Sequence, residues 1–238
     1  EIYIVYRGTD DTIVGWREDF NMAFLDVLPA QKEACVYYRK VLQSMKGRVR
    51  LMGHSKGGNL AVYSAVHGGK AGQKRLLKVY SMDGPGFHED FLELEAYQNI
   101  AEKGLWYMPY ESIIGTVLMH GCNEFIVKSS AKGIMQHNPL SWMICQNMFV
   151  KEKHLSKEAV LAHLAITECL EQLTVEQRKQ FVGIIFDALD ATEAKKLADI
   201  RLKNLLGLID SVKKLDPDSK NLFKETARLV LKTVKENR

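Results

Sequence analysis

Hydrophobic and polar positions alternate in two different ways along the chain. In the first part, short apolar runs are separated by amphipathic stretches, whereas the apolar residues beyond about residue 150 recur at helical spacing. The short runs predict strands at 1–6, 49–52, 77–82, 117–120 and 124–128, and the stretches between them predict helices at 30–45 and 58–67. Strands that alternate with helices favour a mostly parallel sheet covered by helices on both faces.

Residues 151–238 are predicted to form a helical extension. This part has strong 3.6-residue periodicity, and its predicted helices begin at Ser156, at Thr174 with Gln177 as a capping box, at Thr192 and at Asp216. We therefore expect two domains, an α/β domain over residues 1–150 and a helical extension over residues 151–238. The extension either packs against the first domain or docks a partner or a membrane surface.

A short glycine-rich motif carries the candidate chemistry. Gly53-His54-Ser55-Lys56-Gly57 fits G-x-S-x-G, the nucleophile elbow that presents a reactive serine between a strand and a helix in α/β-hydrolases. The flanking runs supply that strand and that helix. Gly53 and Gly57 remove side chains that would clash where the two elements come close. The backbone N–H of Lys56, at the helix start, is suited to a developing oxyanion.

A nucleophilic serine needs a histidine as its base, and the chain has seven histidines. His137 lies in a proline-containing loop after the last predicted strands, which is where α/β-hydrolases carry the base. His54 lies inside the elbow and is not expected to act as the base. His120 lies in a strand-like run and is expected to be structural. His137 is therefore the predicted base.

Four segments resemble the class 3 (fungal triacylglycerol-type) lipases and, more closely, an uncharacterised bacterial lipase-like branch of the α/β-hydrolase superfamily. They follow the order of those lipases: Ile4–Thr9 with Trp16 and Asp19 after it, Met82–Gly86, His120–Glu124, and Gln136–Trp142. The resemblance covers residues 1 to about 145, and the helical extension fits the bacterial branch. It implies an α/β-hydrolase fold. The chain opens on Glu1 and runs directly into a strand, so we expect the N-terminal strands of that fold to be missing.

The resemblance also implies roles for individual residues. Ser55 would be the nucleophile, His137 the base, and the backbone N–H groups of Thr9 and Lys56 the oxyanion hole. Trp16 and Asp19 are expected to pack and to cap a helix. No metal ion and no organic cofactor is implied.

The acid of the triad departs from the class 3 pattern. Ser112 aligns with the aspartate of those lipases, and a serine cannot hold a negative charge against an imidazolium. Asp83, at the end of a predicted strand, and Glu111, beside Ser112, are the two carboxylates that could replace it. We favour Asp83, and a chain without a proper acid is the third alternative. The amphipathic segment 87–106 is either a lid over an acyl pocket or an ordinary sheet-covering helix.

Composition limits the other classes of function. The net charge of +4 comes without a basic run, so no nucleic-acid partner is expected, and no apolar stretch approaches the length of a membrane span. Four widely spaced cysteines favour reduced thiols and a cytoplasmic location. The sequence does not predict an oligomeric state.

The sequence thus predicts a serine hydrolase that cleaves carboxylic esters through a Ser-His-acid triad and an acyl-enzyme, acting on a small-molecule ester or a lipid. The alternative is a catalytically silent lipase-like protein that serves as a binding or scaffold protein. The non-matching Ser112 and the large helical extension motivate this alternative.

Overall fold

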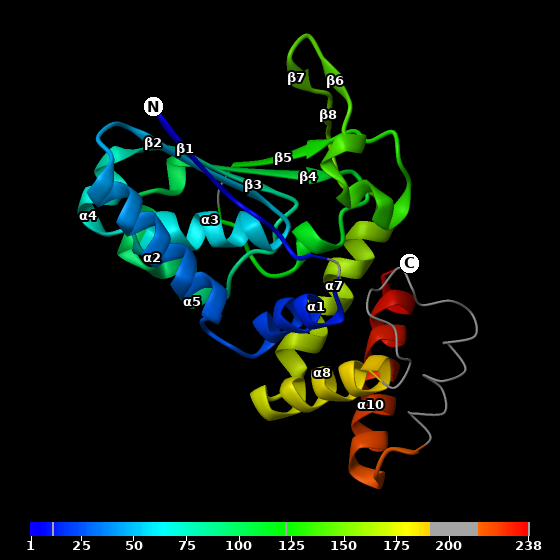
Figure 1. Ribbon diagram of the computed structural model, residues 1–238. Helices are drawn as coiled ribbons and strands as arrows, with labels where there is room; N and C mark the ends of the chain where they lie inside the picture. Colours follow the sequence, from blue (N-terminus) through cyan, green and yellow to red (C-terminus); the bar gives the residue numbers. More distant parts are fainter. Residues whose placement is uncertain (11, 122, 191–213, 238) are drawn as a thin grey trace. The chain divides into compact units, whose positions relative to one another are not determined.

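Figure 1 shows the computed structural model of the 238-residue chain, which describes residues 1–10, 12–121, 123–190 and 214–237. The chain forms two compact units. The first contains Glu1–Gly8 and Pro29–His163, and the second contains Thr9–Leu28 and Leu164–Arg238. These units interleave along the sequence, whereas the predicted domains are continuous and meet at residue 150.

The first unit is built on a six-stranded sheet with the order β1-β2-β3-β4-β5-β8. The strands are β1 (Ile2–Tyr6), β2 (Val49–His54), β3 (Leu76–Met82), β4 (Gly104–Pro109), β5 (Asn123–Val127) and β8 (Lys151–Glu152). Neighbours from β1 to β5 are parallel, and only β8 pairs antiparallel to its neighbour. The predicted mostly parallel sheet is therefore confirmed.

Helices and 3-10 turns connect these strands. They are α2 (Pro29–Ser44), α3 (Lys56–His67), α4 (Gly69–Arg75), α5 (Glu89–Glu93), α6 (Glu95–Gln98) and the 3-10 turns η2 (Ala101–Lys103), η3 (Ile114–Thr116), η4 (Gly133–His137) and η5 (Pro139–Ser141). A separate hairpin contains β6 (Ile144–Cys145) and β7 (Met148–Phe149). Helix α3 contacts β1, β2 and β3 and also α2, so it is buried along nearly its whole length. Because α3 is covered on both sides, its buried residues lie all around the helix rather than along one stripe.

Two predictions about the middle of the chain are wrong. Residues 117–120 do not form a strand, because Leu118 has a φ of 64° that interrupts the extended backbone, and only Met119 makes an isolated bridge with Phe87. Strand β4 was not predicted, because it lies at the end of the segment expected to be a lid or a helix. Within that segment, Tyr97 and Ile100 are buried, which is the arrangement of residues that cover a sheet.

The second unit is helical in its described part. It contains α1 (Ile13–Phe20), the 3-10 turn η1 (Asn21–Ala23), the end of α7 (Lys157–Gln172), α8 (Val175–Asp190) and α10 (Pro217–Glu236). Ile13 of α1 packs with three residues of α8, and Trp16 packs against this cluster. The packing role expected for Trp16 is thus seen.

The predicted helix starts agree with the caps that the structure describes. Thr174 and Gln177 form the reciprocal capping box before α8, with N···O distances of 2.8 and 3.2 Å. Asp216 accepts hydrogen bonds from two N–H groups at the start of α10, and the Ser156 hydroxyl accepts one at the start of α7. Thr192 lies outside the described residues.

Among the described helices, none combines the length and the apolar character that a membrane crossing requires. Cys35, Cys145 and Cys169 are free thiols. The cytoplasmic location stays a prediction.

Candidate active site

Ser55 occupies the turn between β2 and α3, as the G-x-S-x-G pattern predicts. Its backbone has φ 56° and ψ −135°, a region that residues other than glycine seldom adopt. Its N–H donates to the carbonyl oxygen of Met82 at 2.9 Å, which ties the turn to the end of the neighbouring strand β3. Backbone strain of this kind persists only where the surrounding structure enforces it, and it is common at functional sites.

The two glycines of the motif allow this turn to form. A Cβ atom at Gly53 would lie 2.1 Å from the carbonyl group of Gly57, and a Cβ at Gly57 would lie 2.2 Å from the carbonyl oxygen of Tyr6. Both distances are far below a van der Waals contact, and the opposing atoms are backbone atoms that cannot rotate away. The predicted close approach of strand and helix is therefore confirmed.

Asp83 and His137 meet at the carboxyl end of the sheet. Asp83 follows β3 with a φ of 49°, and its carboxylate is 1% exposed. Its Oδ2 lies 2.7 Å from Nδ1 of His137. Its Oδ1 accepts hydrogen bonds from the Ser112 hydroxyl and, at 3.1 Å, from the N–H of Gly115. Three donors therefore satisfy this buried carboxylate, as a buried charge requires.

This arrangement determines which nitrogen of the His137 imidazole carries the proton. Because a carboxylate can only accept, Nδ1 of His137 carries the hydrogen of that bond, and in the neutral ring Nε2 then has the lone pair. A histidine that is oriented by a carboxylate and has a basic Nε2 can take a proton from a serine hydroxyl. The favoured pairing of His137 with Asp83 is the one that the geometry displays.

His54 connects the elbow to the histidine loop. Its Nε2 donates to the carbonyl oxygen of His137 at 2.7 Å, and the centroids of the two rings are 4.5 Å apart. Since His54 directly precedes Ser55, this contact brings the elbow and His137 to the same edge of the sheet. Burial lowers the pKa of His54, and positive charge on His137 lowers it further. His54 is thus a neutral hydrogen-bond donor at neutral pH.

Glu111 contacts the loop of His137 but not its ring. The Glu111 carboxylate accepts hydrogen bonds from the N–H of Gly133 and, at 2.6 Å, from the side-chain amide of Gln136. The backbone carbonyl of Gln136 in turn accepts from the indole N–H of Trp142 at 2.8 Å. Glu111 therefore holds the segment that presents His137, whereas Asp83 holds the imidazole.

The two predicted oxyanion donors lie in different units. Lys56 is the first residue of α3, a position whose backbone N–H suits an anion. Thr9 belongs to the second unit, where its hydroxyl donates to Asp19, and its oxyanion role stays a prediction. Gly8, the residue before it, belongs to the first unit, and a Cβ there would lie 2.6 Å from the carbonyl oxygen of His54.

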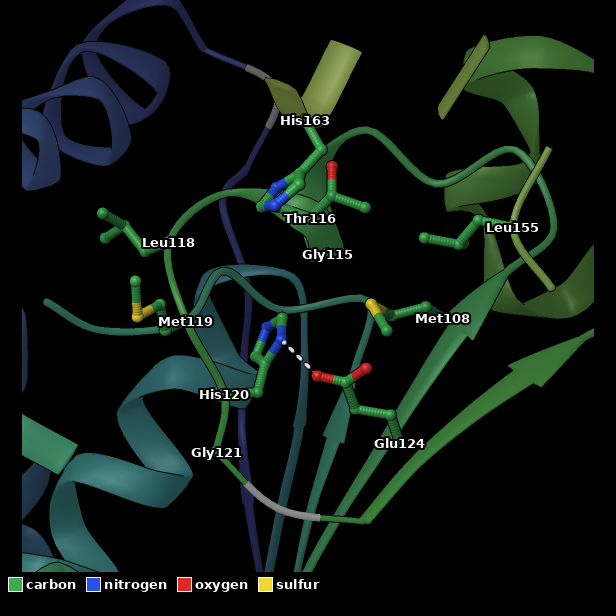
Figure 2. Close-up of a pocket in the computed structure, with 10 residues that line it drawn as sticks. All are labelled: Met108, Gly115, Thr116, Leu118, Met119, His120, Gly121, Glu124, Leu155 and His163. Carbon is green, nitrogen blue, oxygen red and sulfur yellow. Dashed lines mark hydrogen bonds and ion pairs between the residues drawn. The ribbon is translucent and has the colours of Figure 1, made fainter. Parts of the chain in front are cut away.

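A cavity of about 290 Å³ lies beside the loop that binds Asp83 (Figure 2). Its walls include the buried His120, the carboxylate of Glu124 and His163. Nδ1 of His120 lies 3.4 Å from Glu124, and Nε2 lies 3.4 Å from the carbonyl oxygen of Gly84, next to Asp83. The hydrogen bond with His120 lowers the pKa of Glu124. The structural role expected for His120 is consistent with these contacts.

Three contributors to the site were missed at the sequence level, namely the buried donor Ser112, the ring of His54 and the side chain of Gln136. Ser112 was noticed only as the residue that replaces an aspartate. The clue to its role is that a serine in place of that aspartate has a hydroxyl, which can donate to a carboxylate at the end of the neighbouring strand. His54 and Gln136 directly precede Ser55 and His137, and nothing in their spacing indicates contacts across the site.

The fold defines an α/β protein with a mostly parallel sheet. The carboxyl end of this sheet carries a strained serine and a histidine–aspartate pair. The chain belongs to the Mbeg1-like family, whose model matches residues 1–187, well over half of the chain. That match includes the whole sheet and all residues of the candidate site. Neither a search of curated proteins nor a search of solved structures found a match.

Proposed function

We propose that this protein is a serine hydrolase that cleaves carboxylic esters, with an α/β-hydrolase fold and a site of the class 3 lipase type. The observation that carries the proposal is the 2.7 Å contact between His137 and the buried Asp83, next to a serine with φ 56° in a strand-to-helix turn. A structural serine needs neither the strained backbone nor a neighbouring histidine oriented by a carboxylate.

In the proposed reaction, Nε2 of His137 removes the proton of the Ser55 hydroxyl while the oxygen attacks the ester carbonyl. The imidazolium that forms is stabilised by Asp83. The N–H group of Lys56, at the start of α3, holds the oxyanion of the tetrahedral intermediate. His137 then gives its proton to the departing alcohol, which leaves an acyl-enzyme on Ser55.

Hydrolysis of the acyl-enzyme uses the same groups in reverse. His137 removes a proton from water, the hydroxide attacks the acyl carbonyl, and the proton returns to Ser55 as the acid is released. The step needs no metal ion or organic cofactor. Contacts outside the triad determine which acyl chain and which alcohol an esterase prefers. The proposal therefore names the ester bond as the bond that is cleaved and does not name a particular ester.

Two parallel assays test the proposal. Wild type and Ser55→Ala are compared for turnover of a short and a long p-nitrophenyl ester, and for covalent labelling by a fluorophosphonate. The proposal predicts turnover and labelling in wild type, and the loss of both in the variant. A folded wild type that neither turns over nor labels would contradict it and favour a silent binding or scaffold protein.

A further inference from the structure

The segment that carries His137 also carries a set of exposed apolar side chains, here called the apolar patch. Its members are Ile134, Met135, Leu140, Met143, Ile144 and Met148. Leu140 is 91% exposed, and Met135, Ile144 and Met148 are each 67–68% exposed. Single exposed apolar residues are ordinary, but six of them within fifteen residues indicate a surface that is covered in use.

Two members of the apolar patch, Ile144 and Met148, lie on the hairpin β6–β7, which projects away from the main sheet of its unit (Figure 1), and Met143 directly precedes β6. The hairpin turns at Gln146 and Asn147, whose φ values of 50° and 65° fit a tight type I′ turn. Its base is fixed, because Met143 donates to the carbonyl of Lys128 at 2.8 Å and Val150 donates to that of Met143 at 2.9 Å. The apolar side chains are therefore presented on an anchored projection rather than on a loose loop.

Lysines flank these apolar side chains in sequence. Residues 128–154 contain four lysines, Lys128, Lys132, Lys151 and Lys153, and a single acidic residue, Glu152. All four lysines are exposed. Apolar side chains between lysines are the arrangement with which peripheral proteins enter an anionic lipid surface.

The same charge argues against a second copy of the chain as the occupant. A symmetric dimer would place each patch on its own equivalent, and the lysines of the two copies would face one another. Like charges brought together in this way oppose association. An anionic lipid surface both covers the apolar side chains and neutralises the lysines.

We propose that the apolar patch and its lysines dock this protein onto the surface of an anionic phospholipid membrane or micelle. The docking itself does not depend on catalysis. Its consequence for substrate choice does rest on the proposed hydrolase, because Met135 and Leu140 flank His137 in sequence and would bring the site to esters held in the lipid surface.

The experiment is vesicle flotation of the full chain carrying Ser55→Ala, so that hydrolysis cannot alter the vesicles. Vesicles of phosphatidylcholine alone are compared with vesicles that also contain phosphatidylglycerol, at low and at high salt. We expect binding to the mixed vesicles that weakens with salt. Ile144→Ser/Met148→Ser should reduce binding by about tenfold or more, and Lys128→Gln/Lys132→Gln by about tenfold on the mixed vesicles.

Matched controls come from the opposite end of the sheet. Met45 is 51% exposed and Lys46 is also exposed, and both precede the first residue of β2. Lys40, in α2, is exposed as well. Met45→Ser and Lys40→Gln/Lys46→Gln change methionine and lysine side chains without touching the patch, and they should bind as well as the parent. Melting temperatures show that each variant is folded.

Three results would overturn the proposal. One is a folded parent that floats with neither vesicle. Another is equal loss of binding in the patch variants and in the controls. The third is a parent that is dimeric by light scattering and becomes monomeric in Ile144→Ser/Met148→Ser, which would assign the patch to self-association. Flotation reports on docking alone, so its failure would leave labelling of wild-type Ser55 as a separate test of the hydrolase.

Discussion

The turn after β3 and the loop after β4 support the same histidine in different ways. The turn after β3 contributes Asp83, a buried carboxylate that contacts the imidazole of His137 at 2.7 Å. The loop after β4 contributes Ser112, which donates to Asp83, and Glu111, which binds the backbone and the amide around His137. Of the two carboxylates near His137, Asp83 contacts the imidazole ring and Glu111 contacts only the surrounding loop. Contact with the ring is what distinguishes the acid of a triad.

The largest expected effect is that of Asp83→Asn. An asparagine amide cannot stabilise the imidazolium and favours the wrong tautomer of His137, so ester turnover should fall by about 10⁴-fold, as it does in serine proteases. The measurement is the rate of p-nitrophenyl ester hydrolysis, with a melting curve to show that the variant is folded. Near-normal turnover would exclude Asp83 as the acid.

Exchange of the two side chains at the strand ends sharpens the comparison. Because the Ser112 hydroxyl already reaches Asp83, a carboxylate at position 112 lies within reach of the same region. Asp83→Ser/Ser112→Asp should therefore regain about tenfold of the turnover lost in Asp83→Ser alone. A double variant as inactive as the single variant would show that the loop after β4 cannot present an acid to His137.

Glu111→Gln is the matched carboxylate-to-amide change on the other strand end. It weakens the hold on Gln136 and Gly133 but leaves the bond between Asp83 and His137 intact, so turnover should fall by no more than about tenfold. The same ester assay measures it. A loss as large as that of Asp83→Asn would make Glu111 the acid instead.

The elbow, the parallel sheet and the helix starts could be predicted because each depends on residues that are close together in the sequence. The elbow needs only a strand, Gly53, Ser55, Gly57 and a helix in succession, and all of these are adjacent in sequence. The parallel sheet follows from apolar runs that alternate with helices. The helix starts at Thr174 and Asp216 follow from capping residues that act within four positions.

The remainder depends on contacts between distant positions. Ser112 and Asp83 are 29 residues apart, and His54 and His137 are 83 residues apart, so no local pattern indicates either pair. Strand β4 was missed because its short apolar run merges with the amphipathic segment before it. The run 117–120 was mistaken for a strand because its apolar residues hide the left-handed conformation of Leu118.

The smallest expected effect concerns stability at acid pH. Burial lowers the pKa of His54 in the folded protein below its ordinary value of about 6.5. The unfolded chain therefore binds more protons, and the contribution of His54 to stability, present above about pH 6.5, is lost as the pH falls through its folded pKa. His54→Gln keeps a donor for the carbonyl of His137 and removes the titration.

Thermal melts of wild type and His54→Gln at about pH 7.5 and pH 5.5 measure this effect. The drop in Tm on acidification should be smaller in the variant by about 2 °C. His67, whose pKa burial also lowers, contributes a drop of the same sign that both proteins share. An equal drop in wild type and variant would show that His54 does not titrate differently in the folded protein.

The central claim is that Ser55 is an activated nucleophile, and fluorophosphonate labelling tests it most directly. Labelling needs a serine whose proton is removed by a positioned base, and it does not depend on the correct ester having been chosen. The account predicts rapid labelling of wild type at one site, slow labelling of Asp83→Asn and none of Ser55→Ala. Folded wild-type protein that stays unlabelled, or that labels equally well without Ser55, would contradict it.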